Sequence, residues 1–288
     1  MYTEVFSGYM GSCDDYGSSR AVILGAPMDQ TVSFRSGARH GPRQIRSVSE
    51  VLEEYSPRLD RDLADIRYYD AGDVLVVPGM VDENLERIAN TAGRILGDGK
   101  LMILLGGEHL VTLPAIKSAA SCYPGLAVIH FDAHADLRDR YMGQSLSHAT
   151  VMRRATEIVG PENLFQFGIR SGTREEFAFA RSSVNFHSTV DAGDVARAAE
   201  RLKGKPVYVS LDIDVLDPAY APGTGTPESG GCSPGQLFEA LEALSGLKVV
   251  GFDLVEVCPP YDQSERTAIL AAKLVRESLL IFSGEEVK

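Results

Sequence analysis

Short apolar segments recur along the chain, beginning with "AVILGAP" and ending with "LKVVGFDLVEV". They are rich in β-branched and aromatic residues and are bounded by glycine, proline or acidic residues, which is typical of buried strands. The pattern predicts strands at residues 21–27, 66–72, 101–107, 126–134, 163–170, 183–188, 206–214 and 247–257.

Segments with helical periodicity lie between most of these strands. Pro42 fits the first turn of one such helix, where its missing N–H costs nothing. Strands that are apolar on both faces and alternate with helices indicate a parallel sheet covered on both sides. The strand count alone suits either a barrel or an open sheet. Helices are expected at residues 42–55, 82–96, 148–158, 191–202, 233–244 and 265–282.

Polar residues gather where the predicted strands end, in "GGEH", "DAHAD", "DID" and "VE". In parallel α/β folds of either kind, ligands bind at the carboxyl ends of the strands. A functional site is therefore expected there. Because no long linker, repeat or low-complexity tract interrupts the pattern, residues 1–288 are expected to form one domain.

Three of these strand ends carry groups that could ligate metal. Alternate side chains of a strand face the same way, so Asp132 and His134 share a face, as Asp212 and Asp214 do. Two glycines bring a histidine just beyond the strand in "LLGGEH". The candidate ligands are His109, Asp132, His134, Asp136, Asp212 and Asp214.

This set is too large and too anionic for one zinc site, which typically has four ligands. Four carboxylates balance the charge of two divalent cations. Ligands of this kind favour Mn(II), although other divalent metals compete for them. Two metals about 3.5–4 Å apart can share a bridging water and lower its pKa to near neutrality. Metal would also offset the cost of burying so many titratable groups.

The other histidines have weaker claims to function. His40 and His187 stand alone, and we interpret them as structural or surface residues. His130 has the right face of its strand but is expected one layer deeper, supporting a ligand. Asp217 is either a turn residue or a similar support, and the support role is preferred.

Composition limits the partners. The chain is 44% hydrophobic and 24% charged, with a net charge of −12. This charge argues against nucleic acid or an anionic membrane as the main partner and would suit a small cationic molecule, although most acidic proteins are simply made soluble by their charge. No secretory signal or span of about 20 apolar residues is evident. The four cysteines form no CxxC pair, so reduced thiols in the cytoplasm are expected.

The motifs "GGEH", "DAHAD" and "SLDIDVLDPAYAPGTGTPESGG" resemble the three metal-binding motifs of the arginase/agmatinase (ureohydrolase) superfamily. The resemblance extends over nearly the full chain through "SFRSGARHGPRQIR" and "FDLVEVCPPYD". The sequence as a whole is most similar to bacterial agmatinases. Many relatives have "GGDHS" where this chain has "GGEHL". The resemblance implies a three-layer α/β/α sandwich with a central, mostly parallel eight-stranded sheet, and a homo-oligomer, either a trimer or a hexamer.

The resemblance also implies a ligand assignment for two Mn(II) ions per subunit. Asp132 and Asp212 would bridge the two ions. His109 and Asp136 would complete one site, and His134 and Asp214 would complete the other.

Two further residues match catalytic positions of the superfamily. His148 in "LSHAT" matches the histidine that shuttles a proton, and Glu256 in "DLVEV" matches the glutamate that pairs with the substrate guanidinium. A planar guanidinium favours a carboxylate partner, and a leaving amine needs a proton donor. The implied reaction is attack of a metal-bridging hydroxide, oriented by Asp136, on the guanidinium carbon, which releases urea and a primary amine.

The substrate is suggested by departures from the arginase pattern. Arginases read the α-amino group of arginine with acidic residues in a segment resembling "GLRDVD", whereas residues 168–173 here are "GIRSGT". Gln144, Ser145 and Leu146 replace the polar "SGN" that binds the α-carboxylate. A site without partners for charged groups disfavours a substrate that carries them. Agmatine, giving putrescine for polyamine biosynthesis, is therefore the expected substrate.

Other functions stay open. An anionic substrate such as guanidinobutyrate or guanidinopropionate would need a cation, for which Arg138 and Arg140 are candidates if they are not simply loop residues. An aminopropyl-extended agmatine is a further alternative, and Asp139 and Glu175 are weak candidates to hold a terminal ammonium. A catalytically silent metal-binding homologue is conceivable, whereas a two-metal phosphoesterase would need a phosphate clamp that "GTGTPESGG" does not supply.

Overall fold

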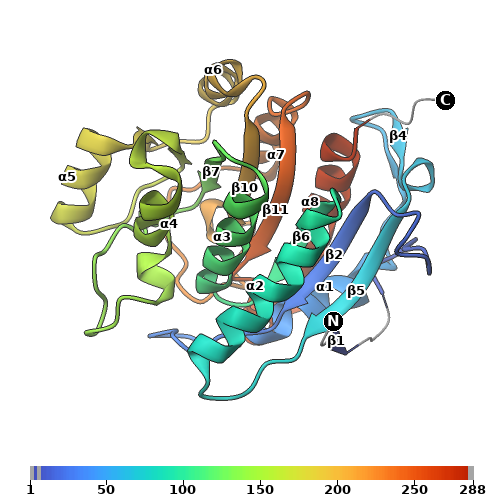
Figure 1. Ribbon diagram of the computed structural model, residues 1–288, viewed down its shortest axis with the longest axis horizontal. Helices are drawn as coiled ribbons and strands as arrows, with labels where there is room; N and C mark the ends of the chain where they lie inside the picture. The colour runs from blue at the N-terminus through green and yellow to red at the C-terminus, as the bar shows by residue number, and fades with distance from the viewer. Residues whose placement is uncertain (1–2, 5–7, 285–288) are drawn as a thin grey trace.

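The computed structural model describes residues 3–4 and 8–284 of the chain, so the expected domain bounds, 1–288, include residues outside the described ones. Its centre is a nine-stranded sheet in the order β1-β5-β2-β6-β11-β10-β7-β8-β9 (Figure 1). The strands are β1 (Thr3–Glu4), β2 (Ala21–Ala26), β5 (Tyr68–Val74), β6 (Leu101–Gly106), β7 (Ala127–Phe131), β8 (Leu164–Phe167), β9 (Asn185–His187), β10 (Pro206–Asp212) and β11 (Lys248–Val255).

All eight predicted strands are present in this sheet, and every pair of neighbours among them is parallel. The short β1 adds an antiparallel edge beside β5. The sheet is open, with β1 and β9 at its two edges, so the barrel alternative is excluded. Every residue of β2 and of β6 is buried, which explains why these strands are apolar on both faces.

Helices cover both faces of the sheet, which confirms the three-layer sandwich (Figure 1). Neighbouring residues of β2 show the division, because Ile23 packs into one apolar cluster and Leu24 into the other. One layer consists of α2 (Val81–Gly97), α3 (Thr112–Cys122), α4 (Val151–Val159) and α5 (Arg174–Ser183). The other consists of α1 (Gly41–Ser49), α6 (Ala192–Leu202), α7 (Pro234–Glu242) and α8 (Arg266–Phe282).

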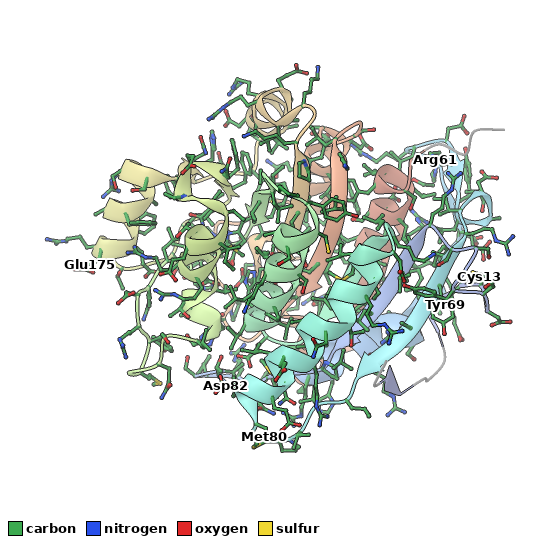
Figure 2. All side chains as sticks on the ribbon, in the orientation of Figure 1. Cys13, Arg61, Tyr69, Met80, Asp82 and Glu175 are labelled. Atoms are coloured by element: carbon green, nitrogen blue, oxygen red, sulfur yellow. The ribbon has the colours of Figure 1, made fainter. Side chains whose placement is uncertain are left out.

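Two of these helices, α3 and α5, escape the sequence prediction. Pro114 lies in the first turn of α3, where it is tolerated but disguises the helix. The helix α5 has a readable start, because Thr173 and Glu176 form a capping box. It lies at the outer end of its layer, where Glu175 points away from the rest of the molecule (Figure 2).

The predicted helix over residues 42–55 is too long, because α1 ends at Ser49. Val51 is 73% exposed, so a helix continued through this residue would gain little from burying its side chain. The chain instead turns into a small hairpin of β3 (Tyr55–Ser56) and β4 (Arg61–Asp62). The predicted helix over residues 148–158 also differs, since His148–Thr150 forms a 3-10 turn before α4.

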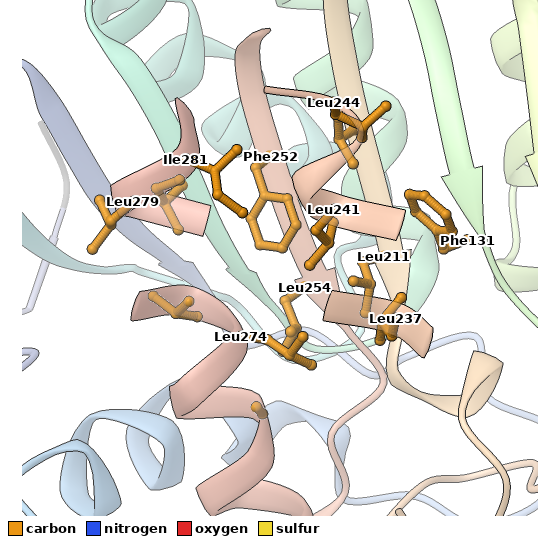
Figure 3. Packing of buried hydrophobic residues seen from close by; sticks show 14 of the residues in the cluster. Phe131, Leu211, Leu237, Leu241, Leu244, Phe252, Leu254, Leu274, Leu279 and Ile281 are labelled. Carbon is orange, nitrogen blue, oxygen red and sulfur yellow. The ribbon is translucent and has the colours of Figure 1, made fainter. Parts of the chain in front are cut away.

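The packing beneath α7 and α8 is typical of the core. Phe252 and Leu254 of β11 lie close to Leu241 of α7 and Leu274 of α8 (Figure 3). All four side chains are fully buried. Burial of one such side chain contributes about 1.5–3 kcal/mol, so this layer holds the sheet firmly beneath its carboxyl ends.

Two further expectations concern membranes and thiols. Within residues 3–4 and 8–284, no helix combines the length and the apolar character that crossing a bilayer requires. Cys13, Cys122, Cys232 and Cys258 are all free thiols.

A buried ion-pair cluster ties α1 to the sheet. Arg46 is 2% exposed, and its Nε donates to Oδ2 of Asp70 at 2.7 Å. Its Nη1 donates to Oδ1 of Asp73 at 2.6 Å. The backbone N–H of Tyr9 also donates to Asp70, at 2.7 Å. Removing the guanidinium would take away the cation that these two neighbouring buried carboxylates share.

We expect Arg46→Ala to lower the free energy of unfolding by about 3–5 kcal/mol, because a broken buried pair leaves uncompensated charge. Arg58→Ala is the control, since Arg58 pairs with Glu242 where both side chains are about one-third exposed. That change should cost less than about 1 kcal/mol. Urea denaturation of both variants would measure the difference, and equal losses would contradict the assignment of Arg46 as a structural anchor.

Candidate metal centre and active site

The carboxyl ends of β6, β11, β10 and β7 meet at one edge of the sheet, because these four strands are neighbours. His109 begins a 3-10 turn after β6, Asp132 follows β7, and Asp212 ends β10. Parallel strands that end together bring their following residues into one cluster. The structure thus brings together all six predicted ligands, and only His134 has a side chain with appreciable exposure, 27%.

A first group of ligand atoms surrounds Nδ1 of His109. Oδ2 of Asp132 lies 3.2 Å from this nitrogen. Oδ2 of Asp136 and Oδ2 of Asp212 both lie 3.3 Å from it. One imidazole nitrogen and three carboxylate oxygens therefore converge, as the ligands of a divalent cation do.

A second group lies beside the first and shares Asp132 with it. Nδ1 of His134 is 2.9 Å from Oδ2 of Asp214 and 3.5 Å from Oδ1 of Asp132. Asp132, His134 and Asp214 are close enough to hold one ion together. Two ligand groups joined by a common carboxylate suit a dinuclear metal site.

Backbone N–H groups fix the orientation of these carboxylates. Oδ1 of Asp132 accepts from the N–H of His134 at 2.6 Å, and Oδ1 of Asp212 accepts from the N–H of Asp214 at 2.9 Å. Oδ1 of Asp214 accepts from the N–H of Ala133 at 3.1 Å. In the bonds of Asp132 and Asp212, an aspartate at position i accepts from the N–H of residue i+2, which is common for aspartate where regular structure ends. These bonds leave the Oδ2 atoms facing the centre.

The ring of His109 is held from behind. Its Nε2 lies 3.0 Å from Oγ of Ser210, which in turn donates to Oδ1 of Asp253 at 2.8 Å. All three residues are essentially buried. A ring nitrogen held in this way keeps the other, Nδ1, directed at the centre.

His130 supports the site from one layer deeper, as the sequence suggests. Its Nε2 lies 2.9 Å from Oδ2 of Asp132, while Nε2 of Gln166 lies 3.0 Å from its Nδ1. Although His130 is near enough to His109 and Asp132 to count as a potential ligand, both of its ring nitrogens are engaged by protein groups. It orients Asp132.

The electrostatics of the cluster call for a cation. Burial raises the pKa of Asp136 well above its usual range, and the charge of Asp132 raises it further. Burial also raises the pKa of Asp212, followed by repulsion from Asp214. Burial alone would raise the pKa of Asp132 too, but His130 and hydrogen bonds from neighbouring histidines hold it well below normal. All four carboxylates can therefore ionise together only beside added positive charge.

Buried polar atoms without hydrogen-bond partners also indicate that these residues could hold metal. Nδ1 of His109 and Oδ2 of Asp214 are buried and have no hydrogen-bond partner among the described residues. Oδ2 of Asp214 meets Nδ1 of His134 at a short distance but outside hydrogen-bond geometry. An unsatisfied buried polar atom costs about 1–3 kcal/mol. Divalent cations would satisfy these atoms at once.

Glu256 follows β11 in the left-handed region, with φ of 63°. Its Oε1 accepts from the backbone N–H of His109 at 2.8 Å. Burial raises the pKa of this carboxyl to about 8, and a bound cation would favour its ionised form. The side chain lines a cavity of about 280 Å³ together with His109, Asp136 and Asp212.

His148 lines the same cavity from its 3-10 turn. Burial lowers the pKa of its imidazole to about 4. The ring lies edge-on to Tyr141, with ring centroids 5.4 Å apart. A half-buried neutral imidazole facing the ligand cluster can take up a proton and pass it on.

The rest of the cavity wall includes Ser171, Gly172 and Thr173 from the "GIRSGT" stretch. Glu176 also lines it and is buried; its carboxylate accepts from the N–H groups of Leu137 and Thr173, at 3.0 and 2.8 Å. The sequence singled out the neighbouring Glu175 and missed Glu176. The capping box, in which Glu176 bonds back to Thr173, was the readable signal.

Of the four charged residues that could hold the far end of a substrate, one lines the cavity and three do not. Arg138 lines the cavity and pairs with Glu176 at 3.2 Å. Arg140 is exposed and donates to a nearby carbonyl. Asp139 pairs with Arg154 at the surface, and Glu175 is exposed on α5 (Figure 2), so neither lines the cavity.

Several other singled-out residues lie outside the cavity wall. Gln144, Ser145 and Leu146 do not line it. Asp217 accepts hydrogen bonds from the N–H groups of Ala219 and Gly230, so it organises its own loop. The predicted role of Asp217 in supporting a metal ligand is therefore wrong. The remaining two histidines match their structural or surface interpretation. His40 is exposed, and His187 stacks on Phe167.

Residues 19–281 match the family described as Arginase family. The chain is 50% identical over 284 residues to an agmatinase of Halalkalibacterium halodurans, covering 97% of this chain and 98% of that protein. It is 48% identical over 286 residues to an agmatinase of Bacillus subtilis, covering 98% and 99%. The solved structure of an agmatine ureohydrolase from Thermoplasma volcanium superposes with a TM-score of 0.86 at 34% identity, covering 97% of this chain and 95% of that one.

We expect Asp132→Asn to remove most of the divalent metal that the wild-type protein retains, because the change takes a charge from the carboxylate shared by both groups. Metal per chain would be measured by inductively coupled plasma mass spectrometry after dialysis. Asp217→Asn is the matched control, since that carboxylate bonds only to its own loop. Equal retention by wild type and Asp132→Asn would contradict the shared-ligand arrangement.

Proposed function

Because this chain belongs to the arginase family, we propose that it hydrolyses the guanidino group of agmatine, giving putrescine and urea for polyamine biosynthesis. The observation that carries the proposal is the Glu256 carboxylate, which is buried in the same cavity as the ligand cluster and His148. The close relatives described as agmatinases support the choice of substrate.

We assign two metal ions to the ligand cluster. Oxygen-rich sites with some imidazole favour Mn(II), and other divalent metals compete for them. When bound, the pair would supply a water of lowered pKa as the nucleophile. One ion would be held by His109, Asp132, Asp136 and Asp212, and the other by Asp132, His134, Asp212 and Asp214.

Glu256 binds the reacting group in this proposal. Its Oε1 is fixed by the N–H of His109, so Oε2 is left to accept an N–H from the substrate guanidinium. A guanidinium N–H bonded to a carboxylate is a strong, planar contact that orients the carbon atom. The raised pKa of Glu256 then falls on binding, because the substrate cation favours the ionised carboxylate.

Asp136 and His148 handle protons. Asp136 accepts a hydrogen bond from the attacking water and so orients it toward the guanidinium carbon. A C–O bond forms and the C–N bond to the alkyl chain breaks. His148 delivers the proton that the leaving nitrogen needs to depart as an amine. The products are urea and putrescine. The proton that the attacking water loses goes to solvent, and His148 regains one from solvent, so the protons balance.

The cavity wall favours a substrate without an α-carboxylate and an α-amine. Ser171 and Thr173 stand where the arginase-like pattern has acids, and they offer only hydroxyls. Buried charged groups left without partners weaken binding strongly. One observation favours a second candidate: Arg138 lines the cavity, and a guanidino acid such as guanidinobutyrate would offer it a carboxylate.

We also propose that residues 1–288 act as one domain, that subunits assemble as a homo-oligomer, either a trimer or a hexamer, and that the protein is cytoplasmic. The single continuous sheet supports the first statement. The four free thiols support a reducing compartment.

We expect Mn(II)-loaded protein to release urea mainly from agmatine when arginine, guanidinobutyrate and aminopropyl-agmatine are tested beside it. The kcat/KM for agmatine should exceed that for arginine by about 10²-fold or more, because the unpaired charges of arginine are costly to bury. Urea mainly from another substrate would keep the reaction and replace the substrate. No urea from any of the four, with metal bound, would overturn the proposed activity.

We expect His148→Ala to lower kcat for agmatine by about 10²- to 10⁴-fold, the usual contribution of a general acid. Metal content should stay unchanged, since His148 contacts no predicted ligand. His40→Ala provides the control, because His40 is an exposed histidine that does not line the cavity. Loss of metal from His148→Ala would instead make His148 part of the ligand set and remove its assigned role.

A further inference from the structure

We propose that Glu108 and Thr31 are positioning residues that set the tautomer of His148, leaving its Nε2 free to exchange the proton used in the reaction. The inference rests on the proposed function and assigns a role to two residues outside the ligand set. Neither residue lines the cavity, and both act through His148.

The first link is the position of Glu108, which directly precedes the predicted ligand His109. Its side chain is fully buried. Oε1 accepts from the backbone N–H of Gln30 at 2.7 Å and from that of Thr31 at 3.0 Å. Oε2 also accepts from the N–H of Thr31, at 3.2 Å. The carboxylate therefore holds the loop that follows β2, and these three contacts to one buried group keep the loop from adopting another position.

Close backbone contact makes this link possible. A Cβ on Gly107 would lie 2.0 Å from the carbonyl oxygen of Met28, so only glycine allows the two segments to approach. The N–H of Glu108 donates to the same carbonyl at 2.7 Å. The turn after β6 and the loop after β2 are thus locked together, and Glu108 bridges them.

The second link is the hydroxyl of Thr31, which donates to Oε2 of Glu108. Because backbone N–H groups donate to both of its oxygens, Glu108 has the hydrogen-bond pattern of an ionised carboxylate, which only accepts. A threonine hydroxyl carries one hydrogen. The single hydrogen of Thr31 is therefore committed to Glu108. Toward any other neighbour, Oγ1 can act only as an acceptor.

The third link is His148, which meets this acceptor twice. Its backbone N–H donates to Oγ1 of Thr31 at 3.1 Å, and its Nδ1 lies 3.4 Å from the same oxygen. Since Oγ1 has no hydrogen left to give, it can only accept from Nδ1, and this contact favours the ring that carries its hydrogen on Nδ1. The neutral ring is then protonated at Nδ1 and unprotonated at Nε2.

This tautomer is the one the reaction needs. An imidazole with Nε2 free can accept a proton there and deliver it to the leaving nitrogen, while Nδ1–H stays bonded to Thr31. The opposite neutral tautomer could give up its Nε2 hydrogen only by becoming an imidazolate, which is unfavourable near pH 7. Glu108 and Thr31 therefore contribute to turnover through geometry and tautomer, and agmatine binding should depend on them little.

Thr31→Val and Thr31→Ser form a matched pair, because valine keeps the shape of threonine and serine keeps the hydroxyl. For Mn(II)-loaded Thr31→Val we expect kcat with agmatine to fall by about 10- to 10³-fold while KM changes less than about threefold. Thr31→Ser should restore kcat to within about threefold of wild type. Metal content and the melting temperature would be measured for every variant.

Glu108→Gln tests the direction of the hydrogen bond. The amide of glutamine can donate to Oγ1 of Thr31, which frees the threonine hydrogen to bond Nδ1 of His148 and favours the opposite tautomer. We expect kcat to fall as in Thr31→Val although the side chain keeps its shape. If Thr31→Val does not fold, this variant, compared at equal metal content, decides the matter.

A change of leaving group separates a proton-transfer defect from a distorted site. In an alkoxyguanidine analogue of agmatine, the leaving alkoxyamine is far less basic than an alkylamine and needs protonation less. The loss of kcat in Thr31→Val should therefore shrink by about tenfold with this substrate. An equal loss with both substrates, or a Thr31→Val enzyme as active as wild type, would overturn the inference. Failure of wild type to release urea would instead overturn the proposed function.

Discussion

The burial of four aspartates and two histidines at the ends of neighbouring strands is the constraint on which the surrounding structure depends. A buried carboxylate costs several kcal/mol unless partners offset its desolvation. Here part of the compensation is local, because Asp132, Asp212 and Asp214 each accept a backbone N–H through Oδ1. The remaining Oδ2 atoms face one another, and burial raises the pKa of Asp136, Asp212 and Asp214, whereas neighbouring histidines hold the pKa of Asp132 low. Bound cations would thus serve the packing of this edge of the sheet as well as the proposed chemistry.

That constraint extends outward through polar contacts in the core. Two imidazoles near the centre have their far nitrogen fixed, His109 by Ser210 and His130 by Gln166. These partners come from the strands themselves, β10 for Ser210 and β8 for Gln166. Strands buried between two helix layers move little, so the ligand geometry is as rigid as the sheet. Alternate side chains of a strand point to opposite faces of the sheet. Polar residues such as Ser210 and Gln166 can therefore lie within strands whose other residues are apolar.

Local pattern explains how much of this could be predicted from sequence. The strands and the ligand set follow from apolar runs that end in "DAHAD" and "DID", where spacing by two fixes the face. Asp253 and Gln166 were missed, because nothing near them in sequence shows that they meet Ser210 and His130. The helices α3 and α5 were missed for another reason, since a proline in the first turn and a short amphipathic face conceal them. The residues of the cavity wall could not be predicted, because the sequence does not show which side of α5 faces the cavity. Glu176 lines the cavity and Glu175 does not.

The same reasoning divides the site into a rigid part and an adjustable part. Ligands stand on strand ends, whereas His148, Thr31 and the "GIRSGT" stretch stand on loops, whose positions need separate fixing. Glu108 meets that need, because it sits on the rigid turn beside His109 and reaches the loop that holds His148. Glu108 therefore joins the turn that carries His109 to the loop whose Thr31 contacts His148.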